Sequence, residues 1–517
     1  MRDKIFYKPN NVIFMKLSVK FSLLALAVLL LSSCSNKDYL KVIPANASFV
    51  ASVNLRSISE KSDFANSSLM DMLDKSMNSM DNDNAELLQK YIDDPMATGI
   101  DLSAPVYVFY TEDELFGVVM KVGSKGDLED TLDKLRKSAR GEMSRPKEKK
   151  GVMCGTIGEI NYAYNGDALL LLMGTGYDSE VSDNTLARMM NGDGKSFVDT
   201  KGYDEITSVD DRDAALYIGL KNLPEKMQRD FREYNQNSPL KTDDIELLFS
   251  LDCKKGAAVM SMKWWGRTKE AQKLIDEAKD NARTIDGEYL GRVPDDLLLW
   301  VGCGANGKKM LEMMKGNEQM RDLMSKMNEM MDVDNIVGAL DGDLSFALSS
   351  SVLEGYNDFY YDYHRPDINF SFNAKVDGAM FKPAFNKMVS TMNDEGLTMT
   401  NVGTDTYKMT YDGVEIQWGL KGDNFYVDTE KAYRQFQGGT ALKEYESDIK
   451  KSYYFVYYNL QKNLQMLDKY TNKGLRQMGV DLSGVKAIIL KMTSHDELVL
   501  ELEMDDDSEN ILRQIIR

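Results

Sequence analysis

Residues 39–46 read YLKVIPAN, and 250 positions later residues 289–296 read YLGRVPDD. Tyrosine, leucine, an aliphatic residue and proline recur in the same order. Further along, the run DMLDK at 71–75 is followed 251 positions later by DLMSK at 322–326. Several matches in one order at a nearly constant offset indicate a tandem duplication.

The duplication predicts two halves, 39–286 and 289–517. Asp101-Leu102-Ser103 is expected to take the place in the first half that Asp343-Leu344-Ser345 takes in the second. A second level of repetition is also indicated, because residues 99–103 (GIDLS) resemble residues 479–483 (GVDLS).

About four copies of one unit are therefore expected, starting near residues 42, 213, 293 and 453. The apolar patterns predict the same order of elements in each: strand, helix, strand, strand, helix. We expect an α+β fold in which each half contains two such units. The sheets should be largely antiparallel, with helices on one face, and each half should form a lobe.

The composition excludes several functional classes. The chain has 517 residues, too many for one ordinary domain, and 82 acidic against 63 basic residues give a net charge of −19. A strongly acidic chain is repelled by phosphate backbones, so no nucleic-acid partner is expected. Two histidines and four cysteines argue against zinc sites and Cys–His catalysis.

The N-terminal region carries one short apolar run, FSLLALAVLLL at 21–31, preceded by Lys16 and Lys20. Eleven residues are too few to cross a bilayer as a helix but suit the core of a signal peptide. The run ends in Leu31-Ser32-Ser33-Cys34, which resembles the lipobox of bacterial lipoprotein precursors. This resemblance implies a signal peptide over 1–33, with Met15 as the true start, and a lipid on Cys34.

The residues after Cys34 bear on localisation. Ser35 follows the cysteine, which resembles outer-membrane sorting, and residues 34–38 form only a short tether. The acidic cluster typical of surface-exported lipoproteins is weak here, with one acid and one base. We therefore expect a protein attached to the outer membrane by its lipid, on the periplasmic face in preference to the cell surface.

No catalytic motif is present, and we expect no catalytic residues, no metal site and no cofactor. The chain lacks a Gly-x-Ser-x-Gly elbow, a Walker loop and a His-Glu-x-x-His pair. Carboxylate pairs remain possible, because acidic residues are so numerous. Besides Cys34, an odd number of cysteines remains (Cys154, Cys253 and Cys303), so at least one thiol should stay free.

The segment 352–366 is the most distinctive candidate binding site, because it lengthens a hairpin with aromatic side chains: Tyr356, Phe359, Tyr360, Tyr361, Tyr363 and His364. Exposed rings with neighbouring carboxylates can stack on sugars or anchor a protein. The alternative is that these rings pack on the neighbouring repeat as a small satellite core.

The mature chain as a whole resembles uncharacterised envelope lipoproteins of Bacteroidetes-type bacteria that are known only as a domain of unknown function. The resemblance rests on Leu-Ser-Ser-Cys at 31–34, on VIPANASFVASVNL at 42–55 and on the duplicated body. It implies no activity. We expect a non-catalytic, lipid-anchored protein that binds an envelope protein or a glycan. The alternative is a carboxylate-dependent hydrolase acting on envelope or dietary polymers.

Overall fold

The computed structural model of the protein describes residues 37–63, 89–138, 141–175, 181–223, 225, 227–229, 240–279, 282–316, 318–352, 366–411, 413–466 and 484–515.

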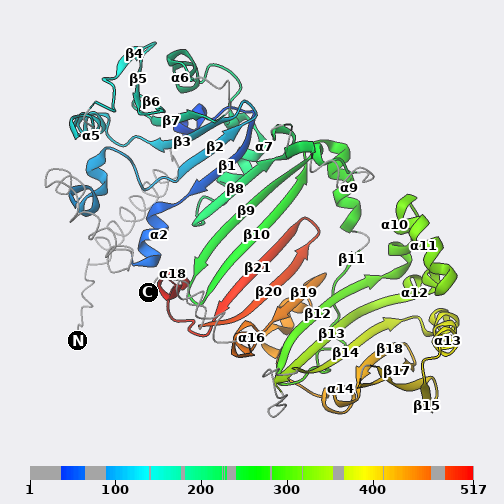
Figure 1. Ribbon diagram of the computed structural model, residues 1–517. Coiled ribbons are helices and arrows are strands. Elements are labelled where there is room, and N and C mark those ends of the chain that lie inside the picture. Colours follow the sequence, from blue (N-terminus) through cyan, green and yellow to red (C-terminus); the bar gives the residue numbers. More distant parts are fainter. Residues whose placement is uncertain are drawn as a thin grey trace, which may run out of the picture.

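The described residues form one continuous sheet of 21 strands, and every strand pairing is antiparallel (Figure 1). The first half supplies β1 (Ala47–Val53), β2 (Val106–Thr111), β3 (Leu115–Lys121), β4 (Lys147–Lys149), β5 (Val152–Ile157), β6 (Ile160–Tyr164), β7 (Ala168–Gly174), β8 (Ala214–Gly219), β9 (Ile245–Lys254) and β10 (Ala257–Gly266). The remainder supplies β11 (Ala282–Arg283), β12 (Leu297–Asn306), β13 (Leu340–Val352), β14 (Pro366–Val376), β15 (Met399–Gly403), β16 (Thr406–Tyr411), β17 (Val414–Lys421), β18 (Asn424–Thr429), β19 (Tyr454–Tyr458), β20 (Val485–Ser494) and β21 (Glu497–Met504).

The strand order runs β4-β5-β6-β7-β3-β2-β1-β8-β9-β10 and continues as β21-β20-β19-β12-β13-β14-β18-β17-β16-β15. β11 pairs with β12, although its residues fall in the range expected for the first half. The order of the second part mirrors that of the first about the β10–β21 pair.

The two expected repeats are therefore joined in one continuous sheet. β10 and β21 would each be an edge strand of a half-sheet, with unpaired backbone N–H and C=O groups. They pair with each other instead, from Ala257 opposite Glu503 to Lys263 opposite Glu497. This ladder satisfies both edges and joins the halves into one body.

The helices follow the strands in a regular order. Strands β1, β8, β12 and β19 are each followed by a helix: α2 (Leu55–Ser62), the short 3-10 helix η5 (Leu220–Asn222), α10 (Gly307–Gly316) and α16 (Leu460–Met466). A hairpin follows later in each unit, in some cases after further short helices, and a second helix closes the unit: α5 (Lys125–Ser138), α9 (Lys269–Lys279), α13 (Gly378–Asp394) and α18 (Ile511–Ile515). The described helices outside these units are α6 (Asp183–Met190), α7 (Lys201–Thr207), α11 (Glu318–Met330), α12 (Val333–Gly338), α14 (Glu430–Gln435) and α15 (Glu446–Ile449), with the short 3-10 helices η1 (Asp38–Val42), η3 (Pro95–Thr98), η4 (Phe197–Asp199), η6 (Thr242–Asp244) and η7 (Lys443–Tyr445).

One of the sequence matches is wrong. Asp101 lies in the loop before β2, whereas Asp343 lies inside β13, opposite Gly304. Val53 and Cys303 are equivalent positions at the offset of 250. Val106 pairs with Val53 and Leu344 pairs with Cys303, so Leu344 takes the place of Val106. A three-residue match is too short to fix an alignment across an insertion.

Helices lie on both faces of the sheet, so the expectation of helices on one face is also wrong. The two largest core clusters lie on what we call the packed face, the side that carries Tyr217, Trp265 and Trp300. α6 and α7 cover this face in the first half, and α14 and α15 cover it in the second. The flanking strands are apolar on both sides, as in the ALLLLMG run of β7. Helices must therefore pack on both sides of these strands to keep the apolar side chains from water.

Candidate functional site

The opposite side of the sheet, which we call the open face, carries Leu251, Met260 and Leu500. Residues directly opposite each other in antiparallel strands point to the same side. The registers therefore align one row of eleven side chains: Val106, Val53, Ala214, Leu251, Met260, Leu500, Leu490, Val456, Val301, Phe346 and Phe372. Ten strand spacings of about 4.8 Å give this row a length of about 48 Å.

All eleven side chains in this row are apolar, and none of them is buried. Leu251 and Met260, at the centre, are 37% and 40% exposed, whereas Tyr217 and Trp300 on the packed face are 3% and 1% exposed. A monomeric protein seldom leaves a continuous apolar surface of this length in contact with water. The open face is thus the strongest candidate for a binding surface among the described residues.

The side-chain pattern of the central strands is typical of a sheet face that packs against other apolar groups. In β21, Leu498, Leu500 and Leu502 alternate with glutamates and Val499, so all the leucines point to the open face. Figure 1 shows β9, β10, β21 and β20 running side by side through the middle of the molecule. A strand with this alternation normally places its apolar side against other apolar groups.

Helices border the open face. Leu128 and Leu132 of α5 pack against the β7 end of the sheet, and Phe381 and Phe385 of α13 pack near Phe372 at the other end. α18 lies near one end of the central strands, where Ile511 packs with Cys253, Ala258 and Leu502. The row of apolar side chains is thus bordered by helices. We call this row the floor, the three helices the walls, and the whole the trough.

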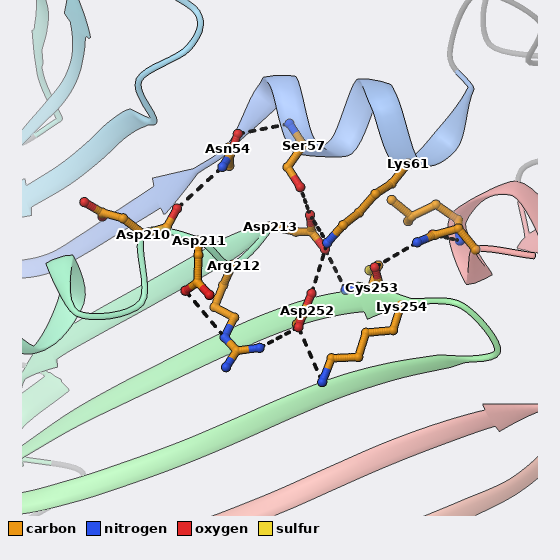
Figure 2. A network of polar contacts seen from close by, with 12 residues as sticks. Asn54, Ser57, Lys61, Asp210, Asp211, Arg212, Asp213, Asp252, Cys253 and Lys254 are labelled. Carbon is orange, nitrogen blue, oxygen red and sulfur yellow. Dashed lines mark hydrogen bonds and ion pairs between the residues drawn. The ribbon is translucent and has the colours of Figure 1, made fainter. Parts of the chain in front are cut away.

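A polar network lies close to the α18 end of this trough (Figure 2). Its centre is Asp213, in the loop before β8, whose side chain is 1% exposed. Lys61 of α2 donates to Asp213 Oδ2 at 2.8 Å and to Asp252 Oδ1 of β9 at 3.0 Å. Asp213 also accepts hydrogen bonds from Ser57 Oγ and from the backbone N–H of Cys253, both at 2.6 Å.

Local sequence explains why these groups meet. Asn54 caps α2 by accepting from the Ser57 N–H at 3.0 Å, which sets the start of the helix. Ser57 and Lys61 are four residues apart, so they lie on one face of α2, toward Asp213. Arg212 pairs with the other oxygen of Asp252. Every carboxylate in this network therefore has a cationic partner.

The C-terminal helix is tied to the same place. Arg513 of α18 donates to the backbone oxygen of Lys61 at 3.2 Å and to that of Glu60 at 3.4 Å. These carbonyls end α2, where a cation is favoured by the helix dipole. Asn510 Nδ2 donates to the Cys253 carbonyl at 2.9 Å. The network thus joins α2, β9 and a helix that comes from the far end of the chain.

The electrostatics of the network favour charged groups. Burial alone would raise the pKa of Asp252, but hydrogen bonds and charge from Lys61 and Arg212 outweigh it and lower that pKa. Burial would lower the pKa of Lys61, but its bonds to Asp213 and Asp252 raise it. A carboxylate held ionised in this way is a poor proton donor at neutral pH. The ion pairs therefore hold α2 against β9 and are not arranged as a proton donor with its acceptor.

Asp252→Asn should therefore make stability less dependent on acid pH. Because the folded pKa of Asp252 is lowered, its stabilising contribution is present above the unfolded value of about 3.9 and is lost as the pH falls through the folded pKa. In urea unfolding, we expect the protein to be more stable than the variant at neutral pH, and the difference to shrink below about pH 4. An equal difference at both pH values would contradict this account.

Two of the pockets among the described residues are considered for binding. The larger, of about 640 Å³, lies beside the network and is lined by Lys61, Lys255, Asp506, Ser508, Glu509, Asn510 and Arg513. It combines basic and acidic groups. The smaller, of about 260 Å³, lies between residues 41–46 and 185–196 and contains no histidine or cysteine.

A carboxylate-dependent hydrolase needs a carboxylic acid with a raised pKa. Among the described carboxyl groups with a resolved shift, only Asp428 has a raised pKa, mainly because it is buried. Asp428 pairs with Arg292 at 2.8 Å and lines neither pocket. Within the same residues, no group of three or more histidine, cysteine, aspartate or glutamate side chains is placed to hold a metal ion.

The cysteines beyond Cys34 lie in strands and are all free. Burial raises the pKa of Cys154 and of Cys253 to about 11, and it also raises that of Cys303. A thiol with a raised pKa is a weak nucleophile. His495, in the turn between β20 and β21, lies 3.5 Å from Asp276 of α9.

The site residues predicted from the sequence lie outside the described residues. This holds for Cys34 and for the aromatic segment with Tyr356, Phe359, Tyr360, Tyr361, Tyr363 and His364. The sequence did not lead us to predict the open face. The leucines at 498, 500 and 502 nevertheless indicated a strand with one apolar side. No helix in the described part of the chain is both long and apolar enough to span a bilayer.

Comparison with known proteins gives a family but no activity. No curated protein matches the chain significantly. Crystal form III of TP0453 is similar over 47% of this chain and 87% of its own, with 13% identity and a TM-score of 0.27. Crystal form I of TP0453 covers 49% and 89%, with 14% identity and a TM-score of 0.26. Residues 39–496 match a domain of unknown function, DUF4836, and the chain belongs to that family.

Proposed function

We propose that the protein is a non-catalytic envelope lipoprotein of the Bacteroidetes type, attached to the outer membrane through Cys34 on its periplasmic face. Its body binds an apolar partner on the open face. The observation that carries the binding function is the row of eleven apolar side chains, none of them buried, across eleven strands. The lipobox at 31–34 carries the anchoring.

The position of Lys37 supports a body held close to the membrane. Lys37 Nζ pairs with Asp210 Oδ2 at 2.9 Å and lies 5.9 Å from the centre of the Tyr203 ring. Lys37 is three positions after Cys34, and three extended residue steps span at most about 11 Å. A lipid on Cys34 would therefore hold the loop around Asp210, which precedes β8, near the bilayer surface.

The open face favours an apolar partner over a glycan. Sugars bind to aromatic rings accompanied by hydrogen-bonding groups, whereas the central row offers no polar side chain. The segment containing Tyr356, Tyr360 and His364 stays a hypothesis for a glycan or a protein partner, because it lies outside the described residues.

We also propose that 39–286 and 289–517 arose by tandem duplication. The mirrored strand order about the β10–β21 pair supports this.

The proposed binding function is tested by thiol accessibility in the native envelope. Leu500 and Val499 are adjacent, half-buried and on opposite faces. If a partner covers the open face, Leu500→Cys should react with a maleimide at least tenfold more slowly than Val499→Cys. The rates are followed by mass spectrometry of the labelled peptide. Similar rates at the two positions would show that the open face is empty and would refute the proposal.

A further inference from the structure

We propose that the occupant of the open face is the hydrocarbon chains of a membrane phospholipid. This inference rests on the proposed function, because it names the chemical class of the apolar partner. Three observations carry it: the chemistry of the floor, the helical walls and the charges at one end.

The floor has almost no free hydrogen-bond donors or acceptors for a polar ligand. The backbone N–H and C=O groups of β9, β10, β21 and β20 are used in ladders with their neighbours on both sides. The side chains of the central row contain no donor or acceptor. A peptide or sugar pressed against this surface would lose hydrogen bonds to water without replacement. A hydrocarbon chain loses none and is favoured by removal from water.

The walls argue against a second sheet or a second copy of this chain. Two packed sheets lie about 10 Å apart, and a helix with its side chains is about 10 Å across. α5, α13 and α18 already occupy that layer at the borders of the open face. Another sheet as wide as the open face would meet these helices at its borders, whereas flexible acyl chains can lie between them.

The end of the trough near α18 supplies charges for a headgroup. Cys253 and Ala258, which face the same side of the sheet as the floor, pack with Ile511. Lys255 and Arg513 line the pocket of about 640 Å³. Asp506 and Glu509 line the same pocket. A headgroup with a phosphate and an amine matches this mixture of charges, since each finds an opposite charge at short range.

Photo-crosslinking of the full chain in its own envelope tests the inference. The probe is p-benzoylphenylalanine placed at position 500, with the same residue at position 499 as the opposite-face control. We expect irradiation to give an adduct with the mass of one phospholipid at position 500, at least tenfold more abundant than at 499. Adding Met260→Glu should lower this adduct at least tenfold, and Val259→Glu, on the packed face, should leave it unchanged.

The possible results separate the two proposals. An adduct with another protein would overturn the lipid inference and leave binding at the open face standing. An adduct with the lipid of Cys34 would also overturn it, because the occupant would be the chain's own anchor. An adduct only with other residues of this chain, or no adduct, would overturn both proposals.

Discussion

Replacing Cys34 by alanine should remove the protein from the membrane or leave it as an uncleaved precursor. The acyl chains on this residue would each bury many CH₂ groups, at about 0.8 kcal/mol apiece. Fractionation of cells should show at least about a tenfold fall in mature protein in the membrane pellet. The burial energy of only two CH₂ groups already corresponds to about a tenfold change in membrane binding.

The matched control is Cys303→Ala, which removes a half-buried thiol of β12. It should leave the distribution unchanged, because it touches neither the signal nor the attachment site. Mature Cys34→Ala protein that stays in the pellet at the original level, without lipid, would refute the anchoring proposal.

Replacing Lys61 by methionine should cost about 3 kcal/mol in the free energy of unfolding. Lys61 is the cationic partner of Asp213, whose side chain is 1% exposed, and it also pairs with Asp252. Methionine keeps much of the length of the side chain but leaves a buried carboxylate without its counter-charge. Ser57 Oγ and the Cys253 N–H still donate to Asp213, so we expect the low end of the range for a broken buried ion pair. Urea unfolding at neutral pH measures the loss.

Two further variants make this prediction specific. Lys41→Met removes an ion pair with Asp38 in which both side chains are at least half exposed, and it should leave the free energy of unfolding nearly unchanged. Adding Asp213→Asn to Lys61→Met should recover part of the loss, because the uncompensated charge is gone. If Lys61→Met is no more harmful than Lys41→Met, the network does not hold α2 to the sheet.

The same network bears on how the two halves act together. Arg513 of α18 contacts the end of α2, and Asn510 contacts β9, more than 250 residues earlier in the chain. Together with the β10–β21 ladder, these contacts join the two ends of the chain in one body. Loss of Lys61 should consequently lower the stability of the whole molecule in a single transition.

The sequence by itself determined the elements and their order. Apolar alternation and helical spacing predicted a strand, a helix, a hairpin and a helix near residues 42, 213, 293 and 453. Strands β1, β8, β12 and β19 begin within a few residues of these positions. Such patterns are local, because a strand or helix repeats its side-chain directions every two or 3.6 residues. The lipobox at Cys34 is also a local signal, and its role remains a prediction.

Only the tertiary structure decided which strands meet and what covers each face. The pairing of β10 with β21 joins residues about 240 positions apart, and Lys61 meets Asp213 across 152 positions. A strand with leucine on one side and glutamate on the other, such as β21, reveals which side chains share a face. It does not reveal whether helices, another sheet or a ligand will lie against them. That depends on the register of every neighbouring strand and on where the helices are packed, and these long-range contacts leave no periodic mark in the sequence.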